Sequence, residues 1–302
     1  MTTRLASWRA GSTRTAVLDF IDAADALPVA DRVAVFDNDG TLWCEKPNYV
    51  QLDFLLAELV RAVESDPTHA SRPEYRALLD HDVAAQAELG MMRIASALVE
   101  LCAGIEPTEF DRRVRDFFAT ARHPSHEVPY HRMRYVPMLE LLDELRAHDF
   151  SVFLVTGGGT EFVRAVAGEF YDVAPEGVVG SMVGYEFVRG PNDEPTLVRT
   201  HEIHGEVDEG PEKVENIQRA LGRRPILAAG NSPGDAEMLE YALASDGPSL
   251  ALLIDHDDAE REFAYESVAG TFETQESIVD TGRSLGWTVV SMASDWETVF
   301  DH

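Results

Sequence analysis

The chain has 302 residues, of which 54 are Asp or Glu and 25 are Lys or Arg, so its formal net charge at pH 7 is −29. A chain this acidic lacks the clustered cations that neutralise nucleic-acid phosphates or anionic lipid headgroups, which argues against both kinds of partner. Since 45% of its residues are hydrophobic, it can bury a substantial core, and we expect the acidity to lie on the surface of one large domain or two smaller ones.

The basic residues are almost all arginine, because Lys46 and Lys213 are the only two lysines. Genomic base composition and solubility both explain such a surface, and adaptation to high salt is a third explanation, since salt screens its self-repulsion. Cys44 and Cys102 are too few for a disulfide framework, and no segment approaches the ~18 consecutive apolar residues of a membrane-spanning helix. We therefore expect a soluble, cytoplasmic protein.

The start of the chain predicts one helix and one strand. Residues 13–26 carry apolar positions at helical spacing. The run RVAVF at 32–36 is short, apolar and rich in β-branched residues, which is typical of a buried parallel strand. It is followed by DNDGT at 37–41, so an acidic cluster is expected at the carboxyl end of this strand.

From about residue 49 to residue 120 the pattern changes to amphipathic helices without a strand. Segments 49–64, 73–103 and 107–121 each place apolar residues at a period of 3.6. The proline-bracketed segment 124–137 is the predicted exit linker. We therefore predict a helical insert, or cap, at 44–136, inserted into a core formed by 1–43 and 137–302.

Helices and strands alternate again after the insert. We predict a helix at 138–149, a buried strand at 150–156, a helix at 161–169 and a hairpin at 177–200 that turns at 190–193. There follow a helix at 211–222, a strand at 225–230, a helix at 234–244, a strand at 249–255, a helix at 257–265 and a short strand at 287–292. This alternation predicts an α/β fold with a doubly wound parallel sheet, whose binding site lies beyond the carboxyl ends of the strands.

Residues with reactive or ligand-binding side chains follow three of these strands. Each alone has an ordinary structural explanation, such as a turn-forming Asp, a loop between strand and helix, or a solvated lysine. The candidates are Asp37 and Asp39 after the first strand, Thr156 and Gly157 after the second, Lys213 in the helix before the third, and Asn231 and Asp235 after the third.

Taken in this order, DNDGT at 37–41, Thr156, Lys213 and GNSPGD at 230–235 resemble the four motifs of the haloacid dehalogenase superfamily. The helical insert between the first two motifs is similar to the cap of its phosphoserine-phosphatase-like branch. The resemblance implies a Rossmann-like core with a helical cap. Dehalogenases of this superfamily lack an Asp two residues after the nucleophile and use no metal, so Asp39 favours the phosphatases.

The resemblance also implies a role for each motif residue. Asp37 is expected to form an aspartyl-phosphate and to ligate Mg²⁺. Asp39 is expected to give its backbone carbonyl to the metal and to act as general acid and base. Thr156, the amide of Gly157 and Lys213 are expected to bind the phosphoryl oxygens.

The last motif departs from the commonest pattern, because Asn231 stands at the first of its two acidic positions. An amide oxygen can ligate Mg²⁺, but the site then carries one negative charge fewer. Either Asn231 or Asp235 is the direct ligand, and the sequence leaves both open. Glu45 and Arg93 are further candidates for substrate contacts, with a packed or solvated side chain as the ordinary explanation of each.

These observations predict a Mg²⁺-dependent phosphatase that hydrolyses a small phosphorylated metabolite. Two alternatives stay open: a phosphotransferase that passes the phosphoryl group to an alcohol, and a catalytically silent family member that binds a ligand. No His or Cys spacing is typical of a zinc site. The substrate and the oligomeric state are not predicted.

Overall fold

The computed structural model describes residues 3–269, 272 and 276–301. Its seven-stranded sheet has the order β4-β3-β2-β1-β5-β6-β7 and is parallel except for the antiparallel pair of β3 and β4. The strands are β1 Val33–Phe36, β2 Ser151–Gly159, β3 Val178–Arg189, β4 Pro195–His204, β5 Leu227–Gly230, β6 Leu250–Asp255 and β7 Thr288–Ser291. The predicted α/β fold with a largely parallel sheet is confirmed.

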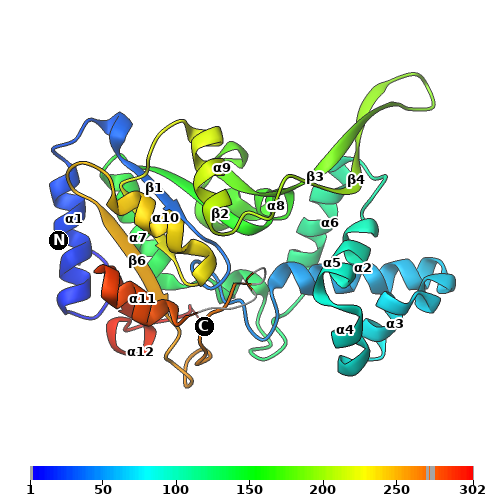
Figure 1. The fold of residues 1–302 in the computed structure, drawn as a ribbon, viewed down its shortest axis with the longest axis horizontal. Coiled ribbons are helices and arrows are strands. Elements are labelled where there is room, and N and C mark those ends of the chain that lie inside the picture. Colours follow the sequence, from blue (N-terminus) through cyan, green and yellow to red (C-terminus); the bar gives the residue numbers. More distant parts are fainter. Residues whose placement is uncertain (1–2, 270–271, 273–275, 302) are drawn as a thin grey trace.

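Helices cover both faces of the sheet (Figure 1). Ala34 and Phe36 of β1 belong to one apolar cluster, with residues of α1 and α7, whereas Val35 belongs to another, with residues of α9 and α10. A strand buried on both faces needs apolar residues at every position, which explains the continuous run RVAVF. The helices of the core are α1 Ser12–Ala24, α7 Val136–Ala147, α8 Thr160–Tyr171, α9 Pro211–Leu221, α10 Ala236–Leu243, α11 Ile278–Leu285 and α12 Met292–Asp295.

Further helices follow one another between β1 and α7 and lie together at one end of the molecule (Figure 1). The chain enters this region beside the point where it leaves, because the Cys44 N–H donates to Met133 O at 2.9 Å and the Tyr135 N–H to Leu42 O at 2.9 Å. The division into a cap at 44–136 and a core stays a prediction. The helices are α2 Val50–Ser65, α3 Pro73–Leu79, α4 Val83–Leu89, α5 Met91–Glu100 and α6 Pro107–Thr120.

The segment 73–103, whose pattern is helical, forms α3, α4 and α5, with the chain turning at Gly90 at a positive φ of 82°. One helix prediction is wrong. Residues 257–265 form turns, because the Asp258 carboxylate accepts hydrogen bonds from the backbone of Glu260 and Arg261 and so competes with helical pairing. Helix α11 was not predicted.

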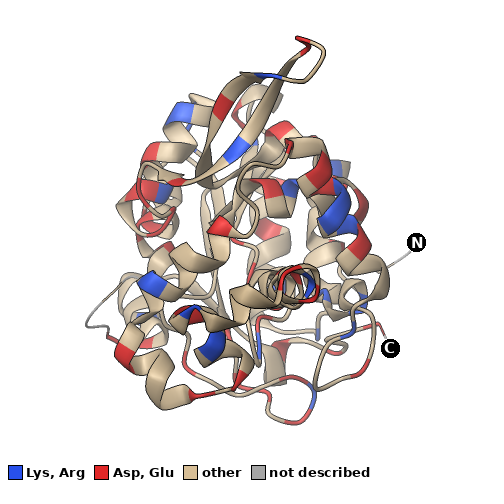
Figure 2. Ribbon diagram, turned by 90° about the vertical axis from the view of Figure 1, so that its right-hand side faces the viewer, with Lys and Arg blue, Asp and Glu red and all other residues tan. Residues whose placement is uncertain are grey.

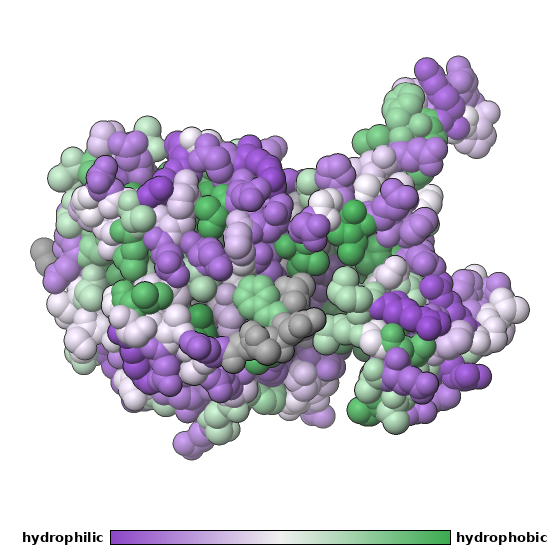
Figure 3. All heavy atoms as spheres, viewed as in Figure 1, coloured by the Kyte–Doolittle hydropathy of each residue, from purple (hydrophilic) through white to green (hydrophobic). Residues whose placement is uncertain are grey.

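The hairpin of β3 and β4 reaches from the sheet to the helical insert. On β4, Arg199 exchanges backbone hydrogen bonds with Gly104 and Ile105 at 2.8 and 2.9 Å. Its guanidinium lies 3.7 Å from the ring centre of Phe110 and forms an ion pair with Glu161 of α8. Beyond this contact the hairpin projects outward and carries exposed apolar side chains, including Phe187 (Figure 3).

Acidic residues are spread over the helices and loops, with basic residues between them (Figure 2). Many of the arginines pair with neighbours on the same helix, as Arg112 does with Glu109 and Asp116 on α6. In the part of the chain that the structure describes, no helix is long and apolar enough to cross a membrane. Against this exposed charge, a small set of buried charged groups stands out at one edge of the sheet.

Candidate active site

The sheet order brings the predicted motifs together. Strands β2, β1 and β5 are neighbours, and Phe36 at the end of β1 pairs with Leu154 of β2 and Ala229 of β5. The residues that follow these pairs therefore meet at one edge of the sheet. They are Asp37 after β1, Thr156 near the end of β2 and Asn231 after β5.

Lys213 lies at the centre of this edge. It comes from the first turn of α9 and is 2% exposed. Its Nζ donates to Asp37 Oδ1 at 2.7 Å, to Asp235 Oδ1 at 2.6 Å and to Val155 O at 3.0 Å, which uses all three of its hydrogens. Although burial lowers the pKa of Lys213, the carboxylates of Asp235 and Asp37 raise it above the ordinary value, so the side chain stays charged.

Asp37 is held from both its backbone and its side chain. Its N–H donates to Ala229 O at 2.9 Å, and its Oδ1 accepts from Lys213. Burial raises the pKa of Asp37 well above the ordinary value, and the charge of Lys213 acts in the opposite direction. Among the described residues, no donor reaches its Oδ2, which leaves one carboxylate oxygen for a ligand.

Asp39 is a partly buried carboxyl whose pKa is set by burial and by its neighbours. Its Oδ1 accepts a hydrogen bond from Trp43 Nε1 at 2.8 Å. Burial raises the pKa of Asp39 to about 6, the Trp43 hydrogen bond lowers it, and the charge of Glu45 raises it. A carboxyl group with this pKa exchanges its proton efficiently at physiological pH.

Asp235 organises the loop after β5. Its Oδ2 accepts from the backbone N–H groups of Asn231 and Ser232 at 3.0 and 2.9 Å, while its Oδ1 accepts from Lys213. Both oxygens are therefore engaged, and the carboxylate anchors Lys213 to the loop.

The Asn231 side chain packs against the turn after β1. Gly40 has φ +72°, and a Cβ on it would lie 2.1 Å from Asn231 Nδ2, so this turn requires glycine. Asn231 Oδ1 lies 3.4 Å from Thr41 Oγ1, and its Nδ2 lies 3.3 Å from Glu45 Oε1. Asn231 stands at a position that is commonly acidic, and the buried carboxylate of Glu45 lies beside it.

The glycines after Thr156 form the irregular end of β2, where the register to β3 shifts between Thr156 and Gly159. Thr156 is fully buried, and its Oγ1 accepts from the Gly158 N–H at 3.0 Å. Gly157 O accepts from Ser181 Oγ at 2.8 Å, and the Gly159 N–H donates to Gln51 Oε1 at 2.7 Å. The Thr156 hydroxyl hydrogen has no acceptor among the described residues, which suits it to bind an anion.

Arg93 is the candidate that the structure does not bring to this group. It lies at the start of α5, pairs with Glu74 at 2.5 Å, and has a side chain that is 57% exposed. It lines a depression of about 360 Å³ between α3, α4 and α5.

The roles of Gln51 and Trp43 were missed by sequence reasoning. The Trp43 indole donates a hydrogen bond to Asp39 Oδ1. Gln51 is separated by 108 residues from the glycine whose N–H it accepts, and no sequence pattern marks such a pair.

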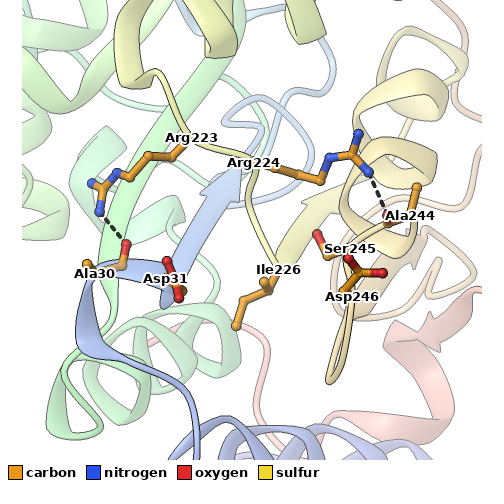
Figure 4. Close-up of a pocket in the computed structure, with 8 residues that line it drawn as sticks. All are labelled: Ala30, Asp31, Arg223, Arg224, Ile226, Ala244, Ser245 and Asp246. Atoms are coloured by element: carbon orange, nitrogen blue, oxygen red, sulfur yellow. Dashed lines mark hydrogen bonds between the residues drawn. The ribbon is translucent and has the colours of Figure 1, made fainter.

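A larger depression, of about 490 Å³, lies at the opposite edge of the sheet (Figure 4). Arg223 and Arg224 point apart in it, donating to Ala30 O at 2.6 Å and to Ala244 O at 2.5 Å. Its other lining residues are Asp31, Ile226, Ser245 and Asp246. None of the predicted site residues lines it.

The protein therefore has an α/β fold with a largely parallel sheet. A buried cluster of Asp37, Lys213 and Asp235 lies at the carboxyl ends of its central strands. A family model described as haloacid dehalogenase-like hydrolase matches residues 34–240, and the chain belongs to this family. No curated protein sequence matches the chain.

Solved structures support the fold. A conserved functionally unknown protein from Anaerococcus prevotii DSM 20548 is 15% identical, with TM-score 0.61 and coverage of 99% of this chain and 98% of that one. A protein of unknown function from Bordetella pertussis Tohama I is 18% identical, with TM-score 0.52 and coverage of 86% and 97%.

Proposed function

We propose that the protein is a Mg²⁺-dependent phosphatase that hydrolyses a small phosphomonoester through an aspartyl-phosphate on Asp37. The observation that carries this proposal is the bridge from Lys213 to Asp37 and Asp235, buried at the carboxyl edge of a parallel sheet. A buried cation beside a carboxylate with one open oxygen suits the transfer of an anionic group to that carboxylate.

The donor atoms at the site fit a hard cation. Asp37 Oδ2 and the Asp39 carbonyl oxygen accept no hydrogen bond from the described residues, and Asn231 Oδ1 has only its 3.4 Å contact with Thr41. Carboxylate, carbonyl and amide oxygens are ligands that Mg²⁺ prefers. Asp37, Asp39 and Asn231 would therefore hold the metal, and Asp235, whose oxygens are engaged, would lie outside its ligands. When bound, Mg²⁺ supplies positive charge that offsets the repulsion between Asp37 and the phosphate.

The side chains of this chain account for both chemical steps. Asp37 attacks phosphorus through Oδ1, the oxygen beside Lys213 that would not hold the metal, forming an O–P bond while the P–O bond to the alcohol breaks, and Asp39 gives its proton to the departing oxygen. The Thr156 hydroxyl and the Gly157 N–H bind the phosphoryl oxygens, while Lys213, whose hydrogens are engaged, orients Asp37 and offsets the phosphoryl charge through space. Asp39, now ionised, takes a proton from water, which attacks phosphorus, releases phosphate and restores Asp37.

The first test is turnover of para-nitrophenyl phosphate with and without Mg²⁺. We expect turnover that EDTA removes, and a fall of roughly a thousandfold or more in Asp37→Asn. Asp31→Asn, the same change at an exposed residue of the opposite edge, is the matched control and should retain activity. An absence of turnover across a broad panel of phosphomonoesters contradicts the proposal.

Adding alcohols to the same assay separates hydrolysis from transfer. A hydrolase releases one phosphate for each alcohol it liberates, whatever acceptor is added. A phosphotransferase releases less phosphate as the acceptor concentration rises.

A further inference from the structure

A side chain from the helical insert reaches the glycines that follow Thr156. Gln51, in the first turn of α2, accepts the Gly159 N–H with its Oε1 at 2.7 Å. The contact joins the insert to the end of β2.

The carboxamide of Gln51 lies close to the groups that carry out the proposed reaction. A Cβ on Gly158 would have Gln51 Oε1 and Thr156 Oγ1 each at 3.2 Å and Asp39 Oδ2 at 3.7 Å. Polar atoms of Gln51, Thr156 and Asp39, which come from three separate elements, therefore surround one point beside Gly158. A Cβ on Gly159 would lie 2.8 Å from Gln51 Nε2, so the carboxamide rests directly on these glycines.

Holding α2 in place does not require this contact. Phe54 of α2 packs against Phe162 of α8, with ring centres 5.4 Å apart. Asp53 accepts a hydrogen bond from Tyr130 at 2.5 Å. An apolar contact and a second polar contact thus already anchor the helix beside the core.

The amide N–H groups of Gln51 are unused among the described residues. Its Oε1 is bound by Gly159, whereas its Nε2, which carries two hydrogens, meets no acceptor within the described part of the chain. The side chain is partly buried, its Oε1 is on the side of Asp39 and its Nε2 lies against Gly159. An amide donor without a protein acceptor at this place suits a hydrogen bond to a bound ligand.

We propose that Gln51 is a specificity-determining residue, whose Nε2 donates to a hydrogen-bond acceptor in the leaving alcohol of the substrate. The inference rests on the proposed phosphatase function and deepens it. It assigns the substrate to phosphomonoesters whose alcohol carries an oxygen acceptor, a hydroxyl or a carboxylate, close to the ester oxygen that Asp39 protonates. Simple alkyl phosphates lack this acceptor.

The test compares kcat/KM for glycerol phosphate, which has neighbouring hydroxyls, with kcat/KM for propyl phosphate, which has none. Gln51→Met removes both polar atoms at similar size, and Gln51→Glu keeps an acceptor for Gly159 but loses the amide donor. We expect the wild type to prefer glycerol phosphate, and both variants to lose about tenfold in this preference. Gln218→Glu, the same charge change at an exposed position of α9, is the control and should retain the wild-type preference.

The outcomes separate this inference from the one it rests on. If the wild type turns over phosphomonoesters but shows no preference, or if both variants keep the wild-type preference, the specificity role is wrong and the phosphatase proposal stands. A purely structural contact would lower kcat for both substrates equally in Gln51→Met and spare Gln51→Glu, which also overturns the inference. If the wild type turns over no phosphomonoester, both proposals fail.

Discussion

Basic side chains lie at both edges of the parallel sheet, but the protein holds them in opposite ways. At the carboxyl edge, Lys213 is buried and donates to two carboxylates, Asp37 and Asp235. At the opposite edge, where the amino ends of the strands lie (the amino edge), Arg223 and Arg224 line an open depression and donate only to backbone carbonyls (Figure 4). The larger depression therefore lies at the edge without the buried charges.

This difference separates two indicators of function. A surface depression forms wherever loops diverge, and forming it costs little free energy. Burying an ammonium and two carboxylates costs several kcal/mol per ion in desolvation, which their attraction offsets only partly. A buried charge cluster with an open oxygen is thus the stronger indicator here, and the carboxyl edge of a doubly wound sheet is where ligands bind.

The largest effect should come from removing the shared cation. Lys213→Met leaves the carboxylates of Asp37 and Asp235 buried without their partner, so we expect a loss of about 3–5 kcal/mol in the free energy of unfolding at pH 8. The loss should shrink as the pH falls, because burial raises the pKa of Asp37 and its protonation removes one of the unpaired charges. Denaturant unfolding at pH 8 and pH 5 measures both effects, and kcat should fall by at least about a hundredfold.

Arg224→Met provides the matched change at the amino edge. Its guanidinium is exposed and lies over the ring of Tyr241, so we expect a change within about 1 kcal/mol and unchanged turnover. Equal losses of stability and activity in the two variants would contradict the distinction between the two edges.

The sequence predicted the carboxyl edge well because its signals are local. A continuous apolar run marks a strand buried on both faces, and the motif residues directly follow such runs at Asp37, Thr156 and Asn231. The features that were not predicted depend on competition between hydrogen bonds or on contacts between residues far apart in the sequence. Residues 257–265 have helical spacing, but the Asp258 carboxylate binds the local backbone instead. The bond between Gln51 and Gly159 depends on how the insert docks against the core, which local periodicity does not encode.

A second prediction sharpens the comparison within the carboxyl edge itself, where Asn231 contributes no charge and Asp235 has both oxygens engaged. Asn231→Asp adds a carboxylate to the proposed ligands, so we expect Mg²⁺ to bind about tenfold more tightly. Without Mg²⁺ the variant should be less stable than the wild type, because Glu45 Oε1 lies 3.3 Å from the Asn231 amide and two carboxylates would then face each other.

Titration calorimetry with MgCl₂ and thermal unfolding without metal test the two parts separately. Asn192→Asp, in the exposed turn of the hairpin, adds the same charge away from the site and should change neither. Unchanged Mg²⁺ affinity in Asn231→Asp would show that Asn231 does not ligate the metal.

The smallest predicted effect concerns a single hydrogen bond at the carboxyl edge. Trp43 Nε1 donates to Asp39 Oδ1, and this bond favours the ionised carboxylate and so lowers the pKa of Asp39. Trp43→Phe removes the donor, so the pKa should rise above about 6. Since Asp39 must be protonated to act as the acid, the alkaline limb of the kcat/KM profile should move to higher pH, by roughly half to one unit.

Trp8→Phe is the matched control, because Trp8 is equally buried and donates to Pro137 O at 2.9 Å, away from the site. It should lower stability without moving the limb, and a limb that stays in place or moves to lower pH in Trp43→Phe would remove Asp39 from the role of general acid.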